Sequence, residues 1–172
     1  MGSEMCIRDS SPDPSYALTA ESSASASILD SSLYEWWSYQ SGLLVANHSP
    51  GLDIDGDGMP NGLEMALGRD PNLADSPNHI QQGQDPDGYL TLTFKRWSGG
   101  VSLANGSYRH FGVTYEPQAT SDLESSASWT SSTIEVRSTL DTGDGMELVT
   151  VRDTLSKNQP ARFLRLKTTL SE

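Results

Sequence analysis

The residues best suited to chemistry are four carboxylates in one twelve-residue stretch, 53–64. Counted from its first residue, side-chain oxygens fall at positions 1, 3, 5, 9 and 12, which are Asp53, Asp55, Asp57, Asn61 and Glu64. Gly58 stands at position 6, where the chain must turn sharply, and Met59 at position 7 offers its backbone carbonyl. This spacing matches the loop of a helix–loop–helix calcium site, in which the final Glu is bidentate.

An acidic turn without a metal is the alternative interpretation, because Asp and Gly are common in solvated turns. The stretch, however, contains no Lys or Arg, so its carboxylates repel one another unless a cation neutralises them. Ca²⁺ binds about six to eight oxygen ligands, and this loop supplies oxygens only. We therefore predict a calcium site here.

Charge is distributed unevenly along the 172 residues, whose net charge is −12. Residues 1–87 carry 14 acidic and 2 basic side chains, whereas residues 88–172 carry 9 of each. This balance argues against a nucleic-acid partner and against anionic membrane surfaces. Cys6 is the only cysteine, which excludes an intrachain disulfide, and no apolar run is long enough to span a membrane.

Four segments follow from composition and periodicity. Residues 1–27 are expected to be a disordered tail and linker, and we interpret residues 1–10 as a translated sequencing scar, which would place the natural start further upstream. Residues 28–75 should form the helix–calcium loop–helix unit. Residues 76–87 are expected to be a connector, and residues 88–172 an antiparallel β domain.

The first helix is predicted over Ile28–Leu44, with a capping box at Ser32 and Glu35 and a stop at Gly42. Its expected apolar face consists of Leu29, Leu33, Trp36, Trp37 and Leu44. On this reading Trp36 belongs to the core, while Trp37 could either pack inside or stack on a sugar. The second helix is predicted over Asn61–Leu67, with Pro60 at its first turn and Gly68 at its end.

From Tyr89 the apolar period changes to two, which indicates strands. We expect Trp97–Ser107 to be a loop, Asp141–Gly145 to be a hairpin turn and Pro117 to mark a bulge or an edge. The predicted strands include Tyr89–Lys95, Phe111–Tyr115, Ile134–Val136, Met146–Val151 and Arg162–Leu170. The expected fold is mainly β with a small α part, in which the helical unit packs on an antiparallel β-sandwich-like sheet of about five strands.

From Trp36 to its end, about 135 of the 172 residues, the chain resembles a module near the C-termini of large secreted proteins from planctomycete- and verrucomicrobia-like bacteria. The matching residues are Asp53, Asp55, Gly56, Asp57, Gly58, Asn61 and Glu64, then Ala66, Leu67, Gly68, Arg69, Asp70 and Pro71. Similar strand segments follow at Tyr89–Phe94, Val113–Glu116, Val149–Asp153 and Arg162–Leu166. The loop itself is also similar to thrombospondin type 3 repeats, dockerins and EF-hands. A dockerin would need a second loop of this kind, which the sequence lacks.

The resemblance implies a secreted or surface-attached accessory module. No nucleophile elbow, P-loop, dinucleotide fingerprint or histidine metal spacing is present, so we expect no enzyme. The predicted function is a monomeric, calcium-stabilised extracellular module. One alternative is a glycan-binding module that uses Trp37, Trp97 or Trp129, and another is a cell-surface attachment or sorting module with a protein partner. Additional cation ligands at Asp70, Asp141 or Asp144 stay open.

Overall fold

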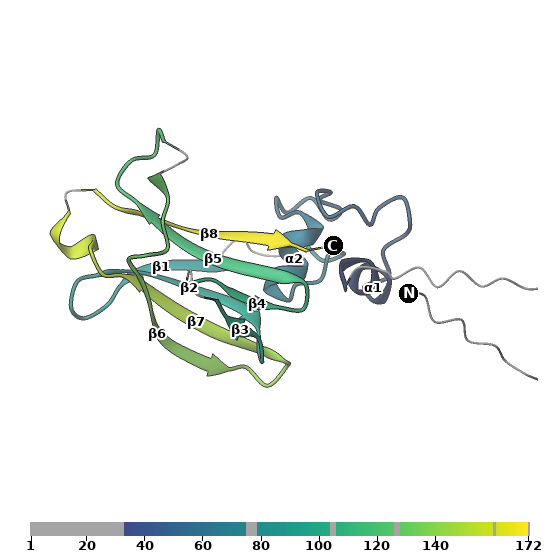
Figure 1. The fold of residues 1–172 in the computed structure, drawn as a ribbon. Coiled ribbons are helices and arrows are strands. Elements are labelled where there is room, and N and C mark those ends of the chain that lie inside the picture. Colours follow the sequence, from purple (N-terminus) through teal and green to yellow (C-terminus); the bar gives the residue numbers. More distant parts are fainter. Residues whose placement is uncertain (1–32, 75–78, 104–105, 126–127, 160, 172) are drawn as a thin grey trace, which may run out of the picture. The chain divides into compact units, whose positions relative to one another are not determined.

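Two antiparallel four-stranded sheets pack against each other in the computed structural model (Figure 1). It describes residues 33–74, 79–103, 106–125, 128–159 and 161–171. The first sheet has the order β1-β2-β7-β6, with β1 (Ile80–Gln84), β2 (Leu90–Trp97), β7 (Met146–Asp153) and β6 (Ile134–Asp141). The second has the order β3-β4-β5-β8, with β3 (Val101–Ser102), β4 (Tyr108–His110), β5 (Val113–Thr120) and β8 (Phe163–Leu170). A 3₁₀ turn, η2 (Ser156–Asn158), lies between β7 and β8.

The period-two pattern of the sequence builds the core between the sheets. On β2, Leu92 and Phe94 are buried, and Phe94 stacks on Tyr115 of β5 with ring centroids 6.4 Å apart. Val149 and Val151 of β7 join this cluster. The prediction of a mainly β, sandwich-like fold is therefore confirmed, but the number of strands is eight in the described residues rather than five.

Two of the additional strands lie where the sequence predicted connections. β1 falls inside the expected connector 76–87 and pairs with β2, Ile80 opposite Phe94. β3 falls inside the expected loop 97–107 and pairs with β4. Both are short or polar edge strands, and both are mostly exposed. An edge strand that buries neither face has no alternating pattern, so periodicity could not find it.

The expected strand Phe111–Tyr115 begins only at Val113, as part of β5, and the two residues before it, Phe111 and Gly112, form a tight hairpin turn between β4 and β5. Phe111 has φ 53° and Gly112 has φ 72°, the left-handed pair of a two-residue β-hairpin. Phe111 is held there by ring contacts with Trp36 and Trp97, at centroid distances of 5.8 Å and 5.0 Å. Pro117 lies on β5 beyond the residues that pair with β4, so it occupies an edge position on that side, as expected.

β6 forms one border of the first sheet, and its side chains are almost all exposed. Its register against β7 shifts between Val136 and Ser138, so that Arg137 is an extra residue in the ladder.

Two short helices accompany the sandwich (Figure 1). α1 (Leu33–Gln40) buries Tyr34, Trp37 and Ser38, which follow helical spacing. The buried face is therefore shifted by one position from the predicted one. Trp36, predicted to be in the core, is 50% exposed, whereas Trp37 is buried and only 8% exposed. Leu33 and Leu44 are exposed as well, and the helix ends before Gly42, whose φ is 76°. Ser38 tolerates burial because its hydroxyl donates to the Glu35 carbonyl, 2.7 Å away. The predicted residues Leu29 and Ser32 lie outside the described part.

α2 (Asn61–Leu67) has the predicted bounds. Gly68 ends it with φ 66°, and Pro60 stands at its N-cap. Two hydrogen bonds fix the end of α2 to the sheets. Trp97 Nε1 donates to the Met65 carbonyl at 2.9 Å, and the Tyr115 hydroxyl donates to the Ala66 carbonyl at 2.6 Å.

The helical part and the sandwich share one hydrophobic core. Tyr34, Trp37, Met65 and Ala66 from the helices belong to the same buried cluster as Phe94 and the other core residues of the strands. None of the described helices is long and apolar enough to cross a membrane.

Candidate metal centre

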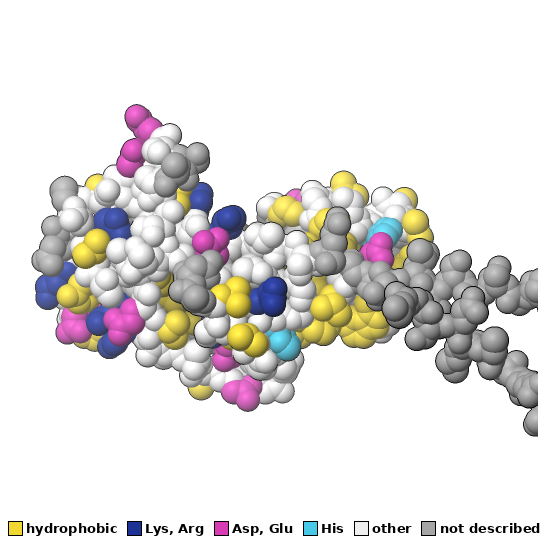
Figure 2. Space-filling view, in the orientation of Figure 1, with side chains coloured by type: hydrophobic (Ala, Val, Ile, Leu, Met, Phe, Trp, Pro, Cys, Tyr) yellow, Lys and Arg dark blue, Asp and Glu magenta, His cyan; other side chains and the backbone are white. Residues whose placement is uncertain are grey.

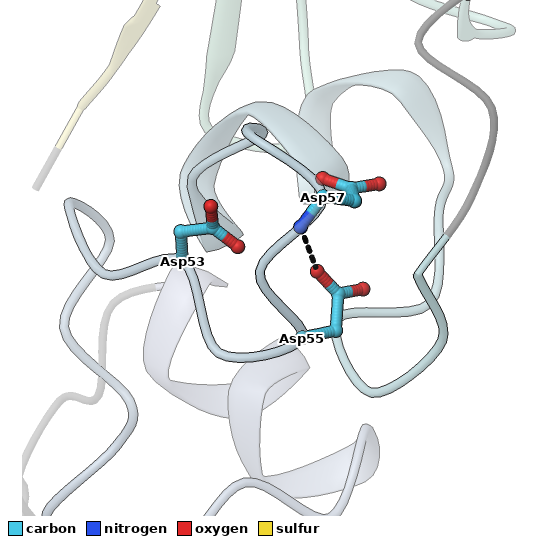
Figure 3. Close-up of side chains that lie close together, drawn as sticks. All are labelled: Asp53, Asp55 and Asp57. Carbon is cyan, nitrogen blue, oxygen red and sulfur yellow. Dashed lines mark hydrogen bonds between the residues drawn. The ribbon is translucent and has the colours of Figure 1, made fainter.

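Three of the predicted ligands converge in the loop before α2. One carboxylate oxygen each from Asp53, Asp55 and Asp57 lies within 4.8 Å of the other two (Figure 3). Such a group of like charges is unfavourable without a cation, because the Coulomb repulsion between carboxylates rises as they approach.

Backbone N–H groups of the loop orient these carboxylates. Asp53 accepts from Gly56 at 2.8 Å and from Gly58 at 2.9 Å. Asp55 accepts from the N–H of Asp57 at 3.1 Å, as drawn in Figure 3. Gly58, at loop position 6, has φ 94°, which only glycine adopts without strain, as the calcium-loop pattern required.

Asn61 anchors the loop to the connector that precedes it. Its backbone N–H donates to the Leu52 carbonyl at 2.7 Å. Its side-chain amide donates to the carbonyls of Asn47 and Ser49, at 2.9 Å and 3.1 Å. Because the side-chain Nδ2 of Asn61 donates both of these bonds, its side-chain oxygen Oδ1 stays available as a ligand.

Glu64 is the most perturbed ionisable group of the centre. Its side chain is 1% exposed, on the first turn of α2. Burial, followed by the charges of Asp55, Asp57, Asp53 and Asp70, raises the pKa of Glu64 to about 7. Its carboxylate is not among the three that lie within 4.8 Å of one another.

The centre holds buried oxygens that lack partners. Asp55 Oδ2, Asn61 Oδ1 and Glu64 Oε2 are buried and make no hydrogen bond within the described residues. Leaving a buried oxygen unpaired costs about 1–3 kcal/mol, and more when it is charged. All three belong to loop positions where the calcium pattern places a ligand, so a bound cation would satisfy them together.

Tyr34 lies beside this group, although no sequence motif indicated it. Burial raises the pKa of Tyr34, the nearby Asn61 side chain opposes the rise, and the charge of Glu64 adds to it. Only the packing of α1 against α2 brings the tyrosine there, so no local motif could have identified it.

Met59, the residue at position 7, is buried, and its N–H donates to Asp57 at 2.8 Å.

The additional candidate ligands have other partners. Asp70 is exposed, and its Oδ1 accepts from the backbone and side chain of Asn72. Asp141 accepts from the N–H of Gly143 at 2.8 Å. Asp144 lies 2.5 Å from Lys95 Nζ, and the hydrogen bonds from Lys95 and Thr142 lower the pKa of Asp144 to about 2. The predicted hairpin turn is present between β6 and β7.

The three candidate tryptophans differ in their surroundings. Trp37 is buried in the core, so its indole is not accessible to a sugar. Trp97 is half-buried, stacks on Phe111 and donates to α2. Trp129 is half-buried and lines a surface hollow.

No family model, curated protein or solved structure matches this chain.

Proposed function

We propose that this chain is a non-enzymatic extracellular accessory module whose helical part is stabilised by calcium. The observation that carries the proposal is the set of three buried, unpaired oxygens of Asp55, Asn61 and Glu64 beside converging carboxylates. An all-oxygen donor set with several carboxylates suits a hard cation, and calcium accepts the flexible geometry of such a loop better than magnesium does.

The proposed role of the cation is structural. Asp53, Asp55, Asp57 and Asn61 would hold it with the Met59 carbonyl, and Glu64 would complete the site from α2. Binding would offset the burial and the repulsion between carboxylates that together raise the pKa of Glu64. Because Trp97 and Tyr115 hold the carbonyls of Met65 and Ala66, ordering of the loop would extend to the sandwich core.

We propose an extracellular setting because we expect this loop to bind calcium weakly. Calcium sites of extracellular modules have a Kd of about 10⁻⁴–10⁻³ M. On the face seen in Figure 2, basic and acidic side chains are interspersed over the strands, and apolar ones gather toward the helical part. The exposed apolar residues of the helical part include Leu33, Trp36, Tyr39, Leu44 and Val45.

Thermal unfolding of the full chain tests the proposal, first in excess EDTA and then in calcium at about 10–100 times its Kd. We expect calcium to stabilise the fold by about 1.4–2.7 kcal/mol, and magnesium to have little effect.

A matched pair of variants locates the effect. Glu64→Gln should remove most of the calcium-dependent rise in Tm, because it removes the carboxylate that completes the site. Asp144→Asn should leave the rise unchanged, because that carboxylate belongs to the separate hairpin. An equal calcium response in wild type and Glu64→Gln would contradict the proposal.

A further inference from the structure

A surface hollow of about 530 Å³ lies away from the metal centre. It is lined by Gly106, Glu116, Trp129, Thr130, Ser131, Ser132 and Ile134. Its volume falls in the range of small-ligand sites, about 300–1,000 Å³. Neither Trp37 nor Trp97 lines it, so of the three tryptophans suggested by the sequence only Trp129 faces this hollow.

The Trp129 indole is held in a fixed position. The Arg165 guanidinium lies 4.1 Å from the ring centroid and covers one face of the ring. Arg165 is itself fixed, since its Nε donates to Oε1 of the buried Gln118 at 2.9 Å. A ring held in this way loses little conformational entropy when a ligand packs against it.

The segment after Trp129 is equally well anchored. Thr130 forms a β-bridge with Ala119 of β5 through two backbone hydrogen bonds, of 2.8 Å and 3.1 Å. The Ser131 hydroxyl donates to the Pro117 carbonyl at 2.7 Å. The hydroxyl groups of the lining are therefore presented by a rigid backbone beside the ring.

The polar lining combines hydroxyl groups with one carboxylate whose charge is offset. Glu116 Oε2 lies 3.3 Å from Lys167 Nζ, an ion pair on neighbouring strands. The hollow thus offers hydroxyl groups that both donate and accept, an aromatic surface, and one carboxylate whose charge is offset by an ion pair. A ligand that carries many hydroxyl groups, presents an apolar C–H face and has no charge matches this lining.

We propose that this hollow binds a neutral pyranose saccharide. One sugar ring packs its C–H face against Trp129, and its hydroxyl groups hydrogen-bond to Glu116 and to the hydroxyls of Thr130 and Ser132. This site is separate from the calcium centre, so it stands or falls independently of the proposed calcium role.

Calorimetric titration of the full chain with cellohexaose, xylohexaose and mannohexaose tests the proposal. At least one of them should bind with a Kd of about 0.1–1 mM, since an open hollow covers only part of a ligand. Trp129→Ala should weaken that binding by about tenfold, the scale of a lost aromatic contact. Glu116→Gln, which preserves the side-chain shape, should weaken it less. Trp36→Ala, which removes an exposed indole that does not line this hollow, should leave it unchanged.

A second measurement uses the unmodified protein, so it does not depend on the folding of a variant. In a two-dimensional NMR titration, the Trp129 indole N–H resonance should shift with saccharide while that of Trp36 stays constant. Absence of binding to all three oligosaccharides would overturn the proposal. So would binding in which Trp36 responds and Trp129 does not, or binding confined to an anionic chain such as polygalacturonate.

Discussion

The Asp53–Glu64 loop and the Asp141–Gly145 hairpin are both Asp- and Gly-rich turns, yet they balance their charges differently. In the hairpin, Asp144 is paired with Lys95 of the neighbouring strand, and the surrounding side chains are exposed. In the loop, three carboxylates converge beside the buried Glu64, with buried oxygens left unpaired. The charge of Asp144 is therefore balanced by a side chain of a neighbouring strand, whereas the converging carboxylates suit the loop to a metal ion.

The two turns also differ in how far they reach into the core. Met65, one residue after Glu64, is fully buried, whereas Leu140, one residue before Asp141, is 64% exposed. In EDTA, Met65→Ala should lower the free energy of unfolding by about 2–5 kcal/mol through loss of burial and formation of a cavity. Leu140→Ala should change it by about 0.5 kcal/mol at most. Urea unfolding measures both, and equal losses would remove this distinction.

The metal-free loop should respond to pH near neutrality, whereas the hairpin should respond only in acid. The pKa of Glu64 is raised in the folded state from 4.5 to about 7, so the folded protein binds the extra proton. The resulting stabilisation is full below pH 4.5 and is lost as the pH rises through 7. The lowered pKa of Asp144, about 2, affects the stability of the folded state only in acid. The stabilisation that this carboxylate provides is lost as the pH falls from 3.8 through about 2.

In EDTA, wild-type Tm should therefore fall from pH 5 to pH 8 more steeply than the Tm of Glu64→Gln. Calorimetric scans at several pH values provide this difference, and contributions from histidine cancel between the two proteins. Parallel curves would show that Glu64 does not titrate in this window.

The smallest expected effect concerns the hairpin pair. Lys95→Met should lower Tm slightly, because the pair is partly exposed, and the loss should disappear in about 1 M NaCl, where charges are screened. The response to calcium should not change. The double variant Lys95→Met with Asp144→Asn should be no less stable than the single one if the two side chains act as a pair. A further loss would indicate another role for Asp144.

Local signals predicted much of this structure. α2 could be bounded because Pro60 and Gly68 flank it, and β2 could be predicted because apolar and polar residues alternate along its first half. The loop spacing brought Asp53, Asp55 and Asp57 together as expected. In each case the sequence signal and the structure lie within one short segment.

Features decided by tertiary contacts could not be predicted in the same way. The aromatic residues of α1 fit two overlapping helical stripes, and only packing against α2 selects the one with Tyr34 and Trp37. β1 pairs with β2 through backbone groups, which its polar sequence does not reveal. The burial of Glu64 likewise depends on neighbours distant in sequence, so its perturbed pKa was not evident from the loop motif.

The extra residue of β6, Arg137, bears on how copies of the protein meet. β6 is an edge strand of the first sheet, so one side of its backbone is left without a partner strand. Its exposed Val136 and Leu140 would favour pairing with a strand of another copy. The register shift breaks the ladder in the middle of this edge, and Arg137 lies 3.5 Å from Glu135 there. A bulged edge that carries charges is a poor template for strand addition, so sheet growth from copy to copy, the route to fibrillar aggregation, is disfavoured at this edge.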